Sequence, residues 1–271
     1  MIDAGAIPES MRPDHGSFRQ RFGAEMGAFS KPKLRPAGGS GGAETVRRLN
    51  AAAAAMHTDI RHRPEPHPVY VAGVIGQSGD AYLPEEALPP QEAREYHELQ
   101  AETLARSGVD FLYAPTFPAL GEALGVARAM AATGLPHVVS FVLGRDGWVL
   151  DGTPLHEAIE RIDAATSPAP LFYSISCVHP LVAAKAIRDE AATSELVGRR
   201  LLEFKANASP LSTQELVRLD HLEGDDPERF AAEMWEIHED FGLPVLGGCC
   251  GTDDRHIRAL AARIAPTGSG S

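Results

Sequence analysis

The chain contains only three cysteines, and each follows a short apolar segment rich in β-branched residues. Cys177 ends the segment 171–177, while Cys249 and Cys250 end the segment 245–250. Three thiolates brought together can hold a tetrahedral zinc ion and leave its fourth position open for a substrate. Thiolate is also the nucleophilic form of sulfur. The positions of the cysteines therefore predict a zinc site of the catalytic kind.

The same cysteines have a plainer interpretation, because a free cysteine behaves as a small hydrophobic residue and is often buried. No Cys-x-x-Cys motif is present. Consecutive residues of a regular strand point to opposite faces, so Cys249 and Cys250 can share one metal only if the chain leaves strand geometry there. Gly247, Gly248 and Gly251 permit that departure. Spacing alone leaves both interpretations open.

From residue 69 onward, segments of strand type alternate with segments of helical periodicity. The expected strands are 69–75, 110–116, 137–143, 171–177, 203–209 and 245–250, and the expected helices are 90–107, 120–133, 155–164, 180–189, 227–241 and 253–264. Such βα alternation predicts a parallel sheet, whose functional groups gather at the carboxyl ends of the strands. All three cysteines lie at such ends.

A closed eight-stranded barrel needs two further strands, and residues 1–68 supply them poorly. They contain a strand stub at 1–4, a loop rich in proline and glycine at 32–42 and a helix at 44–60. We therefore expect an α/β fold, a (β/α)8 TIM-type barrel that is incomplete or irregular in its first two βα units. Its parts are an irregular N-terminal region (1–68), the barrel proper (69–265) and a disordered Gly/Ser tail (266–271).

Composition narrows the class of partner. The net charge is −12, with 44% hydrophobic and 23% charged residues. An acidic globular chain without a basic cluster favours a small-molecule partner and no nucleic acid. Neither a long apolar run nor a signal-like N-terminus is present, so we expect no membrane association and a cytoplasmic protein. Composition does not decide the oligomeric state, and a homo-oligomer stays open.

The motifs around the cysteines resemble those of the homocysteine S-methyltransferase family. Gly247-Gly248-Cys249-Cys250-Gly251-Thr252 is similar to the last strand and helix start of that family, and Ser176-Cys177-Val178-His179-Pro180 is similar to its single-cysteine turn. Further similar segments are Val71–Gly76, Thr116-Phe117-Pro118, Ser140–Leu155 and Asn207-Ala208-Ser209. The resemblance covers about residues 69–265.

This resemblance implies a barrel that uses Zn²⁺ to move a methyl group from a sulfonium, ammonium or folate donor to the sulfur of homocysteine, giving methionine. Cys177, Cys249 and Cys250 are then the zinc ligands. Asn207, Thr116 and Gly248 are the implied substrate-binding residues. The expected partners are a small-molecule thiol and a methyl donor.

Two departures from the family pattern affect the acceptor. Pro115 stands where the family has a glutamate that receives the amino group of the substrate, and only Asp3-Ala4-Gly5 resembles the loop that cradles its carboxylate. One alternative is therefore a methyltransferase for a different thiol. Another is a non-catalytic zinc-binding barrel subunit, completed by a second chain.

Other polar residues near the cysteines have simpler explanations. His179 and His256 are predicted to be solvated, although a fourth metal ligand or a proton shuttle is the alternative. Asp253 and Asp254 favour a helix N-terminus. Glu223, Asp225 and Asp226 are predicted to form a solvated acidic loop.

Overall fold

The computed structural model describes residues 40–61, 68–211 and 224–264. Within these ranges, six parallel strands form one sheet in sequence order. They are β1 (Ala72–Val74), β2 (Phe111–Phe117), β3 (His137–Phe141), β4 (Phe172–Val178), β5 (Leu201–Ala206) and β6 (Val245–Gly248). All six strands expected from residue 69 onward are confirmed, and so is their parallel arrangement.

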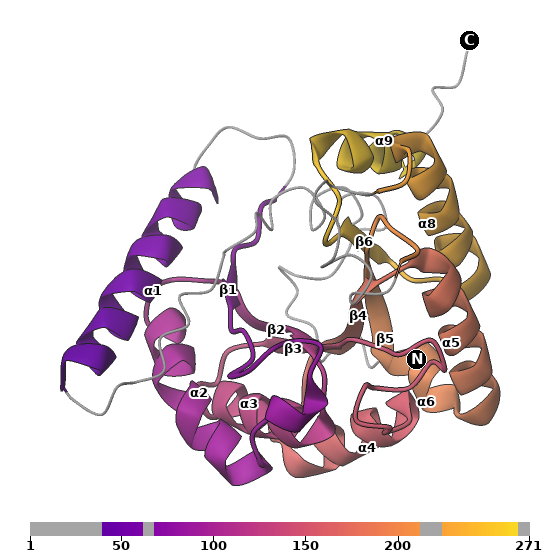
Figure 1. The fold of residues 1–271 in the computed structure, drawn as a ribbon. Coiled ribbons are helices and arrows are strands. Elements are labelled where there is room, and N and C mark those ends of the chain that lie inside the picture. Colours follow the sequence, from indigo (N-terminus) through magenta and orange to yellow (C-terminus); the bar gives the residue numbers. More distant parts are fainter. Residues whose placement is uncertain (1–39, 62–67, 212–223, 265–271) are drawn as a thin grey trace.

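Helices alternate with the strands, beginning with one before β1, and lie in an arc around one face of the curved sheet (Figure 1). They are α1 (Ser40–Arg61), α2 (Pro90–Ala105), α3 (Leu120–Ala132), α4 (Leu155–Ala165), α5 (Pro180–Thr193), α6 (Glu195–Arg200), α8 (Pro227–Phe241) and α9 (Asp254–Ile264), with a short 3-10 turn η3 (Pro84–Glu86). The expected helices are confirmed, whereas α6 was not predicted. None of the described helices is long and apolar enough to cross a membrane.

The local sequence explains where several helices begin and end. Proline occupies the first position of α2, α5 and α8, where a missing N–H costs no hydrogen bond. Asp226 caps α8 by accepting from the N–H groups of Glu228 and Arg229. Gly242 ends the same helix with a φ of 68°, a conformation that glycine adopts without strain.

The described sheet is a curled half-barrel. Within the described residues, β1 and β6 are its two edges, and each pairs on one side only. The parallel βα part of the expected barrel is therefore confirmed. Closure by two further strands was expected within residues 1–68. Of these, 40–61 form the expected helix α1, which begins inside the expected loop 32–42. Residues 1–39, with the expected stub at 1–4, and residues 62–67 lie outside the described ranges, as does the tail at 266–271.

Alternate residues of the strands pack on opposite sides of the sheet. On β2, Leu112 and Ala114 belong to the large core shared with the helices. Phe111 and Tyr113 pack instead with Val138 and other side chains of a second, smaller cluster. Burial on both faces is typical of parallel strands.

A layer of polar side chains lies between this second cluster and the carboxyl ends of the strands. The Tyr113 hydroxyl lies 3.3 Å from the Oγ atoms of Ser174 and Ser176. Lys205 Nζ lies 3.7 Å from the centre of the Tyr113 ring and 3.4 Å from Glu203 Oε1. Burial lowers the pKa of the Lys205 ammonium, and the Glu203 carboxylate partly offsets that effect. These polar groups lead toward the end of the sheet that carries the cysteines.

Candidate metal centre

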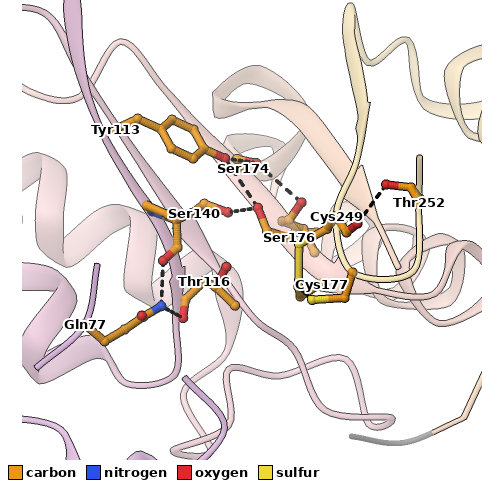
Figure 2. Close-up of a disulfide and its surroundings, with 12 residues drawn as sticks. Gln77, Tyr113, Thr116, Ser140, Ser174, Ser176, Cys177, Cys249 and Thr252 are labelled. Carbon is orange, nitrogen blue, oxygen red and sulfur yellow. Dashed lines mark hydrogen bonds between the residues drawn. A yellow bond between two sulfur atoms is a disulfide. The ribbon is translucent and has the colours of Figure 1, made fainter. Parts of the chain in front are cut away.

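The three cysteines meet at the carboxyl ends of β4 and β6. Figure 2 shows Cys177 and Cys249 side by side there. Their sulfur atoms all lie within 4.8 Å of one another. Cys177 and Cys249 are joined as a disulfide, and Cys250 Sγ lies 3.3 Å from Cys177 Sγ. Side chains 72 residues apart in the sequence thus converge, as a shared site requires.

The backbone leaves strand geometry at both cysteine positions. Cys177 has a φ of 58°, in the left-handed region that few non-glycine residues adopt. Strand β6 ends at Gly248, two residues earlier than the sequence indicated, so Cys249 and Cys250 lie in the turn that follows. Gly251 in that turn has a φ of 80°. The expected departure from strand geometry is confirmed, and it lets adjacent cysteines share one location.

Gly248 allows this turn to close tightly. A β-carbon at this position would lie 2.8 Å from the β-carbon of Thr252 and nearer still to its hydroxyl oxygen. The Thr252 hydroxyl donates to the carbonyl oxygen of Cys249 at 2.7 Å. Close packing against Thr252 thus explains why a glycine occupies position 248. Its predicted contact with substrate stays a prediction.

Asn207 and Thr116 lie at the same end of the sheet. Asn207 follows β5 and exposes only 6% of its surface. Its Oδ1 atom is buried without a hydrogen-bond partner among the described residues. Thr116, near the end of β2, has a φ of 61° and is 9% exposed. Backbone strain such as that of Thr116 recurs at binding sites. A buried acceptor without a partner, such as Asn207 Oδ1, costs free energy unless a ligand donates to it.

Pro115, which stands where the resemblance implies a glutamate, offers only its backbone carbonyl oxygen as an acceptor. That oxygen accepts a hydrogen bond of 2.6 Å from Gln77 Nε2, which also bonds the carbonyl oxygen of Thr116 (Figure 2). Gln77, 6% exposed, was not among the predicted site residues. A polar residue just after a parallel strand was the signal available for it.

Glu122 on α3 anchors the loop that carries Gln77. Its Oε1 atom accepts from Ser78 N at 2.6 Å and from His97 Nε2 at 3.0 Å. Burial alone raises the pKa of the Glu122 carboxyl, but the hydrogen bonds from His97 and Ser78 outweigh it, so the net pKa lies below the usual 4.5. The ionised carboxylate is therefore the form that holds the loop.

A carboxyl whose pKa is lowered by folding stabilises the protein above its unfolded-state pKa, and this contribution is lost as the pH falls through the folded-state value. We expect the unfolding free energy to fall more steeply below about pH 4.5 in the wild type than in Glu122→Gln. Urea unfolding at a series of pH values measures this difference. Glu157→Gln is the control, because Glu157 makes only an exposed ion pair with Arg161. Parallel curves for wild type and Glu122→Gln would contradict the expectation.

The histidines beside the cysteines are buried, so the prediction that they are solvated is wrong. His179 is 5% exposed and His256 4% exposed. His179 Nε2 lies 2.9 Å from Asp225 Oδ2, and His256 Nε2 lies 3.1 Å from the carbonyl oxygen of Asp225. The prediction that Asp225 belongs to a solvated loop is therefore wrong, because the rings of His179 and His256 both contact it. Glu223 lies outside the described residues.

The remaining acidic residues have structural roles. Asp253 lies just before α9 and accepts from Arg255 N at 2.9 Å, and Asp254 opens that helix. Hydrogen bonds from Arg255 and His256 hold the pKa of the Asp253 carboxyl far below its ordinary value. Helix α9 begins soon after the cysteine turn, so the positive end of its dipole lies near that turn.

The protein has a parallel α/β half-barrel, and three cysteines cluster at the carboxyl end of its strands. These features place it in the class of barrel proteins whose site could hold a thiophilic metal. The chain belongs to the homocysteine S-methyltransferase family, because the sequence model of that family matches residues 28–264. The resemblance stated from the motifs is thereby confirmed.

Curated proteins similar to this chain are named as homocysteine S-methyltransferases. Betaine–homocysteine S-methyltransferase 1 of Bos taurus is 25% identical over 273 residues, which span 96% of this chain and 65% of that protein. S-methylmethionine–homocysteine S-methyltransferase BHMT2 of Mus musculus is 27% identical over 176 residues, 62% of this chain and 48% of that protein. The chain thus spans at most about two thirds of the length of these relatives.

Solved structures agree on the fold. Crystal structures of the homocysteine methyltransferase MmuM from Escherichia coli, in oxidized and metallated forms, each superpose with a TM-score of 0.61 at 21% identity. Each match covers 82% of this chain and 71% of MmuM. At this identity, the likeness supports the barrel-type architecture and no more.

Proposed function

We propose that this protein transfers a methyl group to the sulfur of a thiol, with homocysteine as the default acceptor, at a zinc site formed by Cys177, Cys249 and Cys250. The convergence of these three sulfurs at the carboxyl end of the sheet is the observation that carries the proposal. The donor is a methylated sulfonium or ammonium compound, by analogy with the substrates in the relatives' names.

The donor set fits zinc. Zinc–thiolate bonds are about 2.3 Å long, so three sulfurs around one ion lie about 4 Å apart. The three sulfurs here all lie within 4.8 Å of one another, so small movements after reduction would bring them to that spacing. Reducing the Cys177–Cys249 bond with two electrons frees all three sulfurs to bind as thiolates. A bound zinc ion would keep the sulfur of the acceptor ionised near neutral pH.

The protein residues bring the reactants together. Cys177 and the Cys249-Cys250 turn would place the acceptor sulfur at the mouth of the half-barrel, where the S–CH₃ bond forms. The bond from the methyl carbon to the donor sulfur or nitrogen breaks, and its electron pair leaves with the donor. The acceptor loses its thiol proton to solvent. Oriented approach of the donor carbon supplies much of the rate gain in such reactions.

Asn207 is the residue we propose for recognition of the acceptor's amino group. Its Oδ1, buried without a hydrogen-bond partner among the described residues, can accept an ammonium N–H. Pro115 has no side-chain acceptor, and its carbonyl oxygen already accepts from Gln77. A site built around a buried acceptor discriminates strongly against substrates that lack the donor.

A comparison of homocysteine with 4-mercaptobutyrate, which lacks only the amino group, tests this assignment. We expect zinc-loaded, reduced protein to prefer homocysteine by about 10- to 100-fold in kcat/KM, and Asn207→Ala to remove most of that preference. Ser209→Ala, in the same segment, should leave it unchanged. Betaine and S-methylmethionine serve as donors.

Equal rates for the two thiols would favour the second candidate, a methyltransferase for a different acceptor. The observation behind that candidate is Pro115 itself. Zinc binding without transfer from either donor to any thiol would favour the non-catalytic subunit instead. Failure to bind zinc under reducing conditions would remove the proposal altogether.

A further inference from the structure

Asp225 lies where the three loops at the cysteine end of the sheet meet. Its N–H donates to the carbonyl oxygen of Ala208, after β5, at 2.6 Å. Its carboxylate accepts from His179, after β4, at 2.9 Å. Its own carbonyl oxygen accepts from His256, on α9 after β6, at 3.1 Å. One residue therefore connects all three loops.

Each of these partners is close to a cysteine along the chain or through one hydrogen bond. His179 follows Cys177 by two residues. The N–H of Ala208 donates to the carbonyl oxygen of Cys250 at 3.0 Å. His256 lies in the helix that follows the Cys249-Cys250 turn. The contacts of Asp225 thus link the element that carries Cys177 to the turn that carries the other two sulfurs.

These contacts place a proton on the Nε2 atom of both histidines. His179 Nδ1 accepts from Leu181 N at 3.3 Å, so the ring proton is on Nε2 and is donated to Asp225. A carbonyl oxygen only accepts, so His256 Nε2 also carries a proton. The two rings therefore act as donors that converge on Asp225, one from the start of α5 and the other from α9.

The cluster of His179, Asp225 and Glu233 also has the composition of a cation site, with ligand atoms within 4.8 Å of one another. The protonated Nε2 of His179 has no lone pair for a metal. Arg229 also supplies positive charge, since its guanidinium lies 3.0 Å from Glu233 and 3.5 Å from Asp225. These contacts make the cluster a hydrogen-bonded brace and not a second metal site.

We propose that Asp225, bound by His179 and His256, is a clamp that sets the spacing of the three cysteine sulfurs and thereby the affinity of the site for zinc. The inference rests on the proposed function, because it concerns the same site. Asp225 is a positioning residue, since it acts only through the loops that carry the cysteines. Partners that orient metal ligands commonly change metal affinity by about 10- to 100-fold.

The experiment measures zinc affinity by chelator competition in fully reduced, full-length protein, together with the Tm of the metal-free form. Asp225→Ala should weaken zinc binding by about 10- to 100-fold. Asp225→Asn keeps an oxygen for the N–H of His179 and should stay within about threefold of the wild type, as expected for a retained neutral hydrogen bond.

Asp226→Ala is the matched control. Asp226 caps α8 from the adjacent position and makes none of the three clamp contacts. Loss of the cap should lower the Tm and leave zinc affinity within about twofold. The stoichiometry should be one zinc per chain in the wild type and in Asp225→Asn.

A second measurement needs no metal. In metal-free, reduced protein with excess oxidised glutathione, two protein thiols form the Cys177–Cys249 disulfide and glutathione disulfide is reduced to two thiols. Asp225→Ala should slow this step severalfold, and Asp226→Ala should not.

The outcomes separate the two ideas. Unchanged zinc affinity in Asp225→Ala, or equal losses in Asp225→Ala and Asp226→Ala, would overturn the clamp and leave the proposed function standing. A second zinc that disappears with Asp225 would also overturn it, because the cluster would then be a cation site. If the wild type binds no zinc, the proposed function fails, and the disulfide rates alone decide whether Asp225 sets the sulfur spacing.

Discussion

Cys249→Ala is expected to lose the bound zinc and methyl transfer together. Its sulfur is one of the three cysteine sulfurs that lie within 4.8 Å of one another, so the variant leaves two thiolates where three are needed. Changes in residues that merely support metal ligands already cost about 10- to 100-fold in affinity, so loss of a ligand should exceed about 100-fold. Zinc content after gel filtration and transfer from betaine or S-methylmethionine to homocysteine are the measurements.

The protein must be reduced before zinc is added, because Cys177 and Cys249 are bonded to each other in the structure. Thr252→Ser is the control in the same turn, since it keeps the hydroxyl that donates to the carbonyl oxygen of Cys249. A Cys249→Ala protein that still holds one zinc per chain and transfers methyl groups at the wild-type rate would end the assignment of this site.

Gly248→Ala should damage the same turn through packing alone. The added methyl group would lie 2.8 Å from Thr252 Cβ and 3.0 Å from its Cγ2, too close for either to remain in place. Forcing an extra carbon into a packed site costs about 1–3 kcal/mol of unfolding free energy. The displaced turn also carries Cys249 and Cys250, so zinc affinity should fall in the same variant.

Thr252→Gly removes every atom of this clash, and the double variant should recover part of the stability and zinc affinity. The matched control is Gly198→Ala on α6, where an added β-carbon meets nothing within 4 Å. Alanine in a helix is about 0.5–1 kcal/mol more favourable than glycine, so this control should be neutral or slightly stabilising. Thermal unfolding and chelator competition measure both effects. If Gly248→Ala behaves like Gly198→Ala, the tight approach of Thr252 has no consequence.

Much of the fold was readable from the sequence because burial on both faces leaves continuous apolar runs. All six strands were found this way, although β1 and β6 proved shorter than the segments 69–75 and 245–250. Helix α6 was missed, since Glu195–Arg200 is too short for a periodic pattern to stand out. The ends of strands are set by turn geometry and pairing, which residue type reports weakly.

The histidines show what a pattern cannot report. A histidine near a helix start is usually solvated, and nothing in the local sequence of His179 or His256 indicates burial. Helix α8 packs against α5 and α9, and both rings contact Asp225, which lies 46 residues after His179 and 31 before His256. A contact over such separations is a property of the tertiary structure.

The sequence by itself determined which residues can do the chemistry. Three cysteines in family motifs, at the carboxyl ends of apolar segments, indicated the site and the family, because local motifs and strand order are written along the chain. Only the tertiary structure decided that the three sulfurs meet, that Gly248 leaves room for Thr252, and that Asp225 joins the loops around them. Distances between residues far apart in the sequence depend on how the sheet curls and how the helices pack on it, which no local pattern encodes.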